Sequence, residues 1–413
     1  MTTDDLVLFD NASVLDTVAA ELLPDRRVLV RGSDIVEVGG RDVTAPEQAR
    51  TYDLRGKTLM PGLVDAHVHL IAVTADLAAQ AEWSPAYVTA RSAVKLRETL
   101  LRGFTTVRDV GGADYGLADA VAEDLIAGPR VLFGGKALSQ TGGHADLRHR
   151  GKVEFDQHRC CPHMGVVVDG VDEVRRAARH QLRTGADHIK IMLSGGVASP
   201  TDRVDSTQFS VDEIRAAVEE AEAANRYVTG HAYTARAINR GLAAGVRCIE
   251  HGNLMDESSI ELFLEHDAFY VPTLVTYHQL AAQGREYGLP EESFRKVSDV
   301  LERGLGALEL ADKRGVNVVF GTDLLGGMDV HQLDEFRIRA DVQRPADIVR
   351  SATVTAARLL QLEDRIGQVK PGAWADLLVV DGDPLTDLRV LTAPEDRLQL
   401  VMKAGRVYAD RIG

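Results

Sequence analysis

Cysteine is scarce in this chain, and negative charge outweighs positive charge. Only three of the 413 residues are cysteines, Cys160, Cys161 and Cys248, and an odd number with two adjacent residues is a poor basis for a disulfide framework. The 47 lysine and arginine residues face 62 aspartate and glutamate residues, which gives a formal net charge of −15. Because an anionic surface repels nucleic-acid backbones and anionic lipids, we expect neither nucleic acid nor a membrane as a partner.

Long apolar runs are also missing. No stretch reaches the roughly 18 consecutive apolar residues that a membrane-spanning helix needs. The first residues do not combine a basic stretch with an apolar one, as an export signal does. These absences, together with the few cysteines, lead us to expect a cytoplasmic protein. The composition, with 45% hydrophobic and 26% charged residues, is that of a globular protein with a sizeable core.

Two kinds of sequence pattern occupy different parts of the chain. Short strand-like runs separated by glycine turns occupy residues 1–60 and return at residues 365–413, so we expect a small β-sandwich domain built from both chain termini. Residues 61–364 alternate β-branched runs with helical stretches, which is typical of βα units around a parallel sheet. Eight strand runs predict the α/β class with a catalytic (β/α)8 TIM barrel: Leu63–His69, Phe104–Val110, Arg130–Ala137, His188–Leu193, Tyr227–His231, Arg247–His251, Phe269–Thr273 and Val316–Asp323.

The first of these strands carries two histidines, His67 and His69. Side chains two residues apart on a strand point to the same face, so both imidazoles can bind one metal ion. The alternative is a pair of core or surface histidines. Because polar rings facing a barrel interior are costly without a partner, we favour metal binding.

Four further polar residues lie on later strands or at their ends. Lys190 lies between two isoleucines on a strand that we expect to be buried, where a lysine without a partner is rare. It could also extend to the barrel mouth or pair with a carboxylate. His231, His251 and Asp323 each end a predicted strand, and active sites of such barrels lie at the carboxyl ends of the strands. A turn or capping role for Asp323 is the competing interpretation.

This ordered set resembles the amidohydrolase superfamily over essentially the whole chain. The matching pieces are Met60-Pro-Gly-Leu-Val-Asp-Ala, His67-Val-His69, Lys190, His231, His251, Gly321-Thr-Asp323 and the segment 367–381. The resemblance implies that His67, His69 and Asp323 hold one divalent metal ion and that His231 and His251 hold a second. It further implies that Lys190, carboxylated to N6-carboxylysine, bridges the two ions, since two neighbouring dications need an anion between them.

Nitrogen and oxygen ligands without thiolate suit zinc best, with manganese, cobalt and iron left open. The expected mechanism is attack on an amide carbonyl by a hydroxide held between the two ions, which lower the pKa of water. Asp323 is expected to take the proton of this hydroxide and pass it to the leaving nitrogen.

Residues 140–144, 193–202 and 231–234, together with residues 106–112, resemble the branch of Xaa-Pro dipeptidases and metal-dependent carboxypeptidases, whose relatives include imidazolonepropionase and ochratoxin-hydrolysing amidases. These motifs contain His144, Tyr233 and Arg108. In that branch the residue matching His144 donates to the substrate carbonyl, and the residue matching Tyr233 helps to hold the terminal carboxylate. A loop histidine, a packed tyrosine and a salt-bridge arginine are the alternatives. Arg203 could pair with a substrate carboxylate, or with Asp202 or Asp205.

The function that we expect is prolidase-like cleavage of an amide bond to a C-terminal amino acid, with a dipeptide or N-acyl amino acid as the small-molecule substrate. The first alternative is hydrolysis of a non-peptide amide, lactam, carbamate or ochratoxin-like N-acyl amino acid. The second is a catalytically silent scaffold, although no ligand of the family pattern is missing. The resemblance alone suggests a homo-oligomer. We interpret residues 147–164, with several histidines and Cys160-Cys161, as a lid or surface loop.

Overall fold

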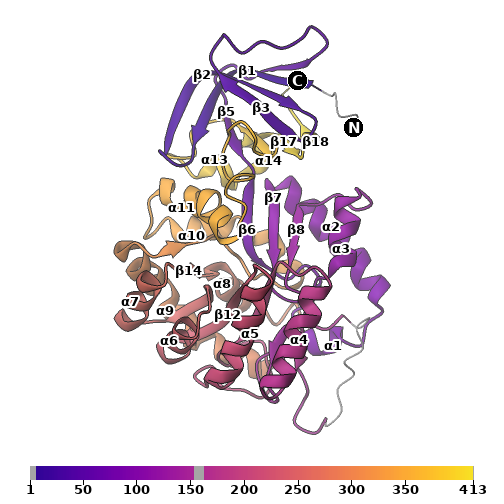
Figure 1. Ribbon diagram of the computed structural model, residues 1–413, viewed down its shortest axis with the longest axis vertical. Helices are drawn as coiled ribbons and strands as arrows, with labels where there is room; N and C mark the ends of the chain where they lie inside the picture. Colours follow the sequence, from indigo (N-terminus) through magenta and orange to yellow (C-terminus); the bar gives the residue numbers. More distant parts are fainter. Residues whose placement is uncertain (1–5, 153–161, 413) are drawn as a thin grey trace. The chain divides into compact units, whose positions relative to one another are not determined.

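The computed structural model describes residues 6–152 and 162–412, in which strands and helices alternate in an α/β arrangement (Figure 1). The chain forms two compact units. The first comprises Met1–Asp65, Arg97–Thr106 and Arg339–Gly413, and the second comprises Ala66–Leu96 and Val107–Ile338. Within the described ranges, none of the helices has the length and apolar character needed to cross a membrane.

The first unit contains an eight-stranded sheet to which both ends of the chain contribute (Figure 1). Its order is β18-β17-β16-β5-β1-β2-β3, with β4 beside β1. Leu59 lies opposite Val379 in the antiparallel pairing of β5 and β16. All these strands belong to one sheet, so the predicted β-sandwich is not confirmed, and the predicted domain limits stay a prediction. The bounds are β1 Leu6–Asp16, β2 Glu21–Arg31, β3 Asp34–Gly39, β4 Arg50–Asp53, β5 Thr58–Pro61, β16 Leu377–Val380, β17 Leu398–Lys403 and β18 Arg406–Asp410.

The remaining strands form a parallel seven-stranded sheet and a three-stranded sheet. The larger sheet has the order β10-β9-β11-β12-β13-β14-β15, and the smaller one has the order β6-β7-β8. Each of the eight predicted strand runs overlaps at least one of these strands. The run Arg130–Ala137 covers β8 and the first residue of β9, and β10 is additional. The bounds are β6 Leu63–Val68, β7 Phe104–Asp109, β8 Arg130–Phe133, β9 Ala137–Ser139, β10 Gly165–Val167, β11 His188–Met192, β12 Tyr227–Thr234, β13 Cys248–Leu254, β14 Phe269–Val271 and β15 Asn317–Val318.

The two parallel sheets are not assigned to one closed barrel within the described residues, so closure stays a prediction. Backbone hydrogen bonds nevertheless cross between strand segments of different sheets. The Ala66 N–H donates to the Phe320 carbonyl at 2.9 Å, and the Asp187 N–H donates to the Phe133 carbonyl at 2.8 Å. The first of these bonds places the end of β6 beside the segment that leads to Asp323.

Capping residues mark where helices begin. At α5, the Ser210 hydroxyl accepts from the Glu213 N–H at 3.3 Å, and the Glu213 carboxylate accepts from the Ser210 N–H at 2.7 Å. α4 lies beside α5 (Figure 1), and Arg175 of α4 pairs with Glu220 of α5. The helices are α1 Leu77–Gln80, α2 Pro85–Leu101, α3 Tyr115–Ala122, α4 Val171–Arg183, α5 Val211–Ala223, α6 Ala235–Ala243, α7 Glu257–Glu265, α8 Leu274–Gln283, α9 Glu291–Arg314, the 3-10 helix Gly326–His331, α10 Asp334–Arg339, α11 Pro345–Ser351, α12 Val354–Leu359, α13 Arg389–Thr392 and α14 Pro394–Arg397.

The strand register brings polar residues to one end of the parallel sheets. Met192 of β11 lies beside His231 of β12, and His231 lies beside Glu250 of β13. The Asp323 N–H donates to the His67 carbonyl at 2.8 Å, which places Asp323 at the end of β6. The carboxyl ends of parallel strands meet at a common edge, so residues distant in sequence become neighbours there.

Candidate metal centre

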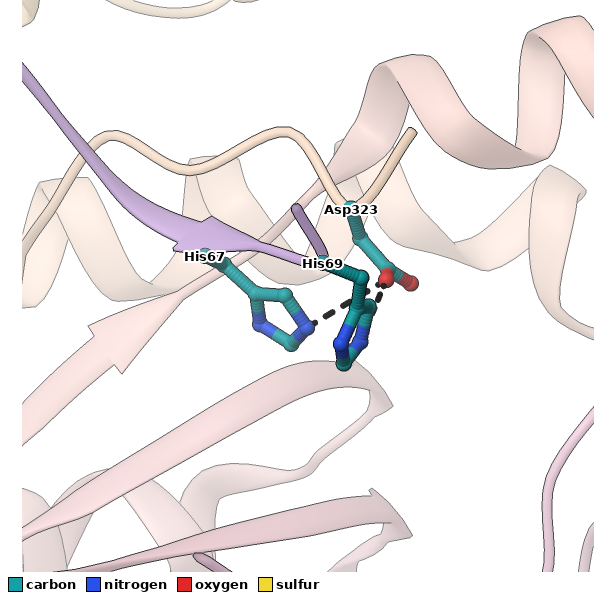
Figure 2. Close-up of side chains that lie close together, drawn as sticks. All are labelled: His67, His69 and Asp323. Carbon is teal, nitrogen blue, oxygen red and sulfur yellow. Dashed lines mark ion pairs between the residues drawn. The ribbon is translucent and has the colours of Figure 1, made fainter. Parts of the chain in front are cut away.

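His67, His69 and Asp323 converge at the end of β6 (Figure 2). The Nε2 atoms of His67 and His69 lie 3.3 Å and 3.2 Å from Oδ1 of Asp323. One ligand atom from each residue lies within 4.8 Å of the other two, a spacing that could hold a metal ion. The two imidazoles share a face because β6 alternates its side chains, and the backbone bond from Asp323 to β6 brings the carboxylate to them.

His251 and His231 lie directly beside this group. The His251 ring centroid is 4.9 Å from that of His67 and 4.5 Å from that of His231. Lys190 of β11, only 2% exposed, lines the same cavity. The structure therefore brings together the six residues predicted as metal ligands, and their roles as ligands remain predictions.

The backbone at three of these strand ends adopts a conformation that non-glycine residues rarely occupy. His251 has φ 73°, Thr273 has φ 49° and Asp323 has φ 54°. A side chain in the left-handed region costs on the order of 1–3 kcal/mol, and such residues concentrate where their side chains must point in a particular direction. Here Thr273 Oγ1 lies 2.8 Å from His251 Nδ1, and the same ring nitrogen is 4.0 Å from Oδ2 of Asp323.

Each of the four imidazoles has one ring nitrogen in a hydrogen bond to a group that is not one of the six candidate ligands. The partners are the Glu250 carboxylate at 2.6 Å for His67 Nδ1, the Gly111 carbonyl at 2.8 Å for His69 Nδ1, the Gly195 carbonyl at 3.1 Å for His231 Nε2 and the Thr273 hydroxyl for His251 Nδ1. Histidines that bind metals are held in this way, because a proton fixed on one nitrogen leaves the lone pair of the other for the ion. The donor set therefore fits a divalent metal ion.

The pKa directions agree with this arrangement. Burial holds the pKa values of His231 and His251 well below the usual histidine range, so both rings are neutral. Burial also opposes ionisation of Asp323, but the adjacent His67 and His69 hold its pKa well below the usual range. Burial opposes protonation of His67, yet the Asp323 and Glu250 carboxylates raise its pKa. Because the Asp323 and Glu250 carboxylates stabilise positive charge here, the site favours a cation between these side chains.

Glu250 is a buried residue of the site to which sequence reasoning assigned no role. Its carboxylate lies 2.6 Å from His67 Nδ1 and accepts from Arg108 at 2.6 Å, and the Thr229 hydroxyl donates to it as well. Burial opposes ionisation of Glu250, but Arg108 holds the pKa of the carboxyl well below its usual range. The sequence did contain an indication that Glu250 belongs to the site. In Ile249-Glu250-His251 a charged residue lies on a strand expected to be buried, and such a residue needs a partner, as was argued for Lys190.

Lys190 differs from Glu250 because it lacks a close partner. Nζ of Lys190 forms no hydrogen bond or ion pair within the part of the chain that the structure describes, although Glu250 and Asp323 act on it electrostatically. Burial lowers its pKa to about 8. A buried lysine that is readily uncharged suits modification of the amine by carbon dioxide, since the neutral amine is the reactive form.

Eight of the ten residues predicted as ligands, catalytic groups or substrate contacts line a cavity of about 70 Å³. They are His67, His69, His144, Lys190, His231, Tyr233, His251 and Asp323. The hydroxyl of Tyr277 donates to that of Tyr233 at 3.0 Å, a contact that sequence reasoning missed. Burial lowers the pKa of His144 to about 4, and Asp202 opposes this shift. The rest of the lining is mostly apolar, with Leu77, Ala145, Leu147, Met164, Met192, Val197, Ala198, Leu280 and Leu325.

Two candidate substrate residues do not line this cavity. Arg108 is fully buried and pairs with Glu250, so the salt-bridge alternative describes its position. Arg203 has a largely exposed side chain that pairs with Asp205 at 2.8 Å, again the alternative left open above. Contact of either arginine with a substrate stays a prediction. Of the segment 147–164, residues 153–161, which include Cys160 and Cys161, lie outside the described residues.

Comparison with known proteins identifies the family. The sequence model of the Amidohydrolase family matches residues 58–408. The chain belongs to the amidohydrolase family. The ochratoxinase of Aspergillus niger is 32% identical to this amidohydrolase over 425 residues, covering 97% of this chain and 87% of that protein.

Two solved structures share the fold of this amidohydrolase. A prolidase complexed with N-methylphosphonate-L-proline is 47% identical with a TM-score of 0.96, covering 98% of this chain and 100% of that chain. A Xaa-Pro dipeptidase with methionine bound in its active site is 29% identical with a TM-score of 0.88. The match covers 98% of this chain and 100% of that chain. The predicted family is confirmed, and so is the prediction of an enzyme that acts on C–N bonds.

Replacing Glu250 by glutamine tests its contact with His67. The neutral amide keeps the shape but loses the charge that faces Arg108 and orients the imidazole. We expect the affinity for divalent metal to fall by about 10- to 100-fold, the usual cost of losing a residue that orients a metal ligand. Metal content after dialysis against graded chelator measures this change. Glu220→Gln, which removes a charge from the α4–α5 pair, serves as the control, and unchanged metal retention in Glu250→Gln would contradict the role.

Proposed function

We propose that this amidohydrolase is a binuclear metal-dependent hydrolase that cleaves the amide bond to a C-terminal amino acid, as a dipeptidase or carboxypeptidase similar to prolidase. The observation that carries the proposal is one cavity lined by six potential ligands together with His144 and Tyr233. The solved prolidase, 47% identical over nearly the whole chain, supports it. The interstrand bond from Ala66 to Phe320 supports closure of the parallel strands into a (β/α)8 barrel around the site.

In this proposal His67, His69 and Asp323 would hold one divalent cation, and His231 and His251 would hold the other. Lys190, carboxylated at Nζ, would supply the anionic group that two neighbouring cations need. Zinc suits these nitrogen and oxygen ligands best. When bound, such ions lower the pKa of water toward neutrality and polarise a carbonyl group. The orientation of the four imidazoles and the ionised Asp323 described above are the observations that support these assignments.

Asp323 is the proton carrier in this proposal. Its carboxylate, ionised because of His67 and His69, accepts a proton at Oδ2 from the water that attacks the amide carbon. As the C–N bond breaks, the carboxyl passes that proton to the leaving nitrogen, which becomes a neutral amine. Asp323 thereby returns to its ionised state, and the other product keeps the oxygen of the water as a carboxyl group.

Tyr233 and His144 bind the substrate on either side of the scissile bond. The Tyr233 hydroxyl accepts from Tyr277, so its own proton is free to donate to the C-terminal carboxylate. Burial raises the pKa of Tyr233, so the hydroxyl keeps that proton. His144 forms a hydrogen bond to the carbonyl oxygen as this atom gains charge. The apolar side chains of the cavity then contact the uncharged acyl part of the substrate.

A second candidate substrate is an ochratoxin-like N-acyl amino acid. The Aspergillus niger ochratoxinase, 32% identical over 97% of this chain, favours it. The apolar lining of the cavity is compatible with an aromatic acyl group as well as with an amino acid side chain. Both candidates share an amide bond to an amino acid with a free carboxylate, so the same residues serve either.

Replacing Asp323 by asparagine separates metal binding from catalysis. The amide still offers an oxygen ligand but no longer accepts a proton. We therefore expect a variant that retains metal, although more weakly, and loses turnover by about 10²- to 10⁴-fold, the usual contribution of a positioned acid or base. Metal analysis and steady-state kinetics on the same preparation measure both properties. Wild-type activity in this variant would remove Asp323 from the mechanism.

Substrate selection tests the assigned reaction. Metal-loaded enzyme should cleave dipeptides or N-acyl amino acids with a free carboxylate and should leave their C-terminal amides intact. Tyr233→Phe should raise KM for the free acids by about 10- to 100-fold, which corresponds to losing a hydrogen bond to a charged group. Chromatographic product analysis over a paired library measures this selectivity, with Tyr115→Phe, an exposed tyrosine, as the control. Equal cleavage of acids and amides would contradict recognition of the carboxylate.

A further inference from the structure

The first turn of α8 is not capped by the side chain that precedes it. Thr273 adopts the left-handed conformation and makes no side-chain hydrogen bond to the start of the helix. Its hydroxyl instead lies 2.8 Å from Nδ1 of His251. Because the first N–H groups of a helix have no partner within the helix, another acceptor must satisfy them where the helix begins inside the protein.

Glu335 of α10 supplies that acceptor. Its Oε2 accepts from the N–H of Val275, the second residue of α8, at 2.7 Å. Both residues are fully buried, and they lie 60 residues apart in the chain. A carboxylate at the start of a helix is a strong acceptor, because its charge also faces the positive end of the helix dipole. A side chain from another helix thus caps α8.

The segment that contains Glu335 also contacts the other end of α8. Nε2 of Gln283, the last residue of α8, lies 3.2 Å from Nε2 of His331. His331 ends the 3-10 helix Gly326–His331, and its Nδ1 lies 2.9 Å from Oδ2 of Asp334. Residues 326–335 therefore hold α8 at both ends.

α8 carries side chains that line the cavity of the candidate metal centre. These are Thr276, Tyr277 and Leu280. The Tyr277 hydroxyl donates to that of Tyr233 at 3.0 Å, and the two ring centroids are 6.0 Å apart. Val275 and Tyr277 belong to the same helical turn, so a displacement of the Val275 backbone also moves the Tyr277 ring.

We propose that Glu335 is a positioning residue for substrate binding, because its cap on α8 places the Tyr277 hydroxyl against that of Tyr233. This inference rests on the proposed function, in which Tyr233 donates to the C-terminal carboxylate of the substrate. Glu335 is not among the residues that line the cavity. Its effect on the substrate therefore passes through the first turn of α8 and through Tyr277.

Hydrogen exchange tests the cap without any substrate. In metal-loaded enzyme, amide hydrogens at the start of the peptide 274–283 should exchange about 10-fold faster in Glu335→Ala, because the Val275 N–H loses its acceptor. Glu335→Gln keeps an accepting oxygen and should stay near the wild type. Asp256→Ala, which removes the side-chain cap of α7, is the matched control and should change exchange at α7 alone. Unchanged exchange at α8 in Glu335→Ala would overturn the proposal.

Kinetics test whether the cap matters for the substrate. Glu335→Ala should raise KM for substrates with a free carboxylate by about 10-fold while kcat changes less than about threefold, because contact with the carboxylate is made before and during the reaction alike. Glu335→Gln should restore KM to within about threefold of the wild type, and Asp256→Ala should leave KM unchanged. A wild-type KM in Glu335→Ala, or no rescue by glutamine, would overturn the role.

A double variant separates positioning from a general loss of stability. Tyr277→Phe removes the hydroxyl on which Glu335 acts and should itself raise KM. Adding Glu335→Ala to Tyr277→Phe should then raise KM by less than about twofold, since coupled residues do not contribute independently. Effects that multiply in full would show that Glu335 acts by another route and would overturn the proposal.

Thermal melting and metal content identify any variant that fails to fold. If Glu335→Ala is such a variant, Glu335→Asp takes its place, because the shorter side chain keeps the charge but withdraws the carboxylate from Val275. The same changes in exchange and KM are then expected. Wild-type behaviour of Glu335→Asp in both measurements would overturn the proposal.

The two proposals fail differently. If the wild type cleaves no amide but exchange at α8 depends on Glu335, the proposed function falls and the cap on α8 stands. If amides are cleaved while the Glu335 variants match the wild type in exchange and KM, the positioning role falls and the proposed function stands.

Discussion

The buried carboxylate of Glu250 is the group on which the geometry of this centre depends most. It contacts His67 of β6, Arg108 of β7 and Thr229 of β12, so one side chain links three strands to its own strand, β13. A charge removed from water is tolerated only when partners of good geometry surround it. Arg108 supplies the opposite charge, and His67 is consequently held with its second nitrogen toward Asp323.

The same principle appears twice in the site, with different connections. Glu250 acts on His67 directly, whereas Glu335 acts on Tyr277 through the first turn of α8. In both cases a buried carboxylate sets the position of a residue that lines the cavity. His69 and His231 are oriented more simply, by a backbone carbonyl, and His251 is oriented by the Thr273 hydroxyl.

The positions of the strands and the convergence of their polar ends could be predicted from the sequence, for a physical reason. Short β-branched runs between helical stretches mark buried parallel strands, and the carboxyl ends of such strands meet. The exact closure of the sheets could not be predicted, because it depends on hydrogen bonds across short segments such as β15, which has two residues. Arg108 and Arg203 were open to two interpretations, since a sequence shows a charge but not the partner that neutralises it.

The sequence by itself determined the kinds of ligand and their order along the chain, since histidine, lysine and aspartate at strand ends follow from local patterns. Tertiary structure alone decided which ring meets which carboxylate. His67 and Glu250 are 183 residues apart, and Val275 and its partner Glu335 are 60 residues apart. Strand register and loop path set such pairings, and both result from packing of the whole chain, so no local pattern records them.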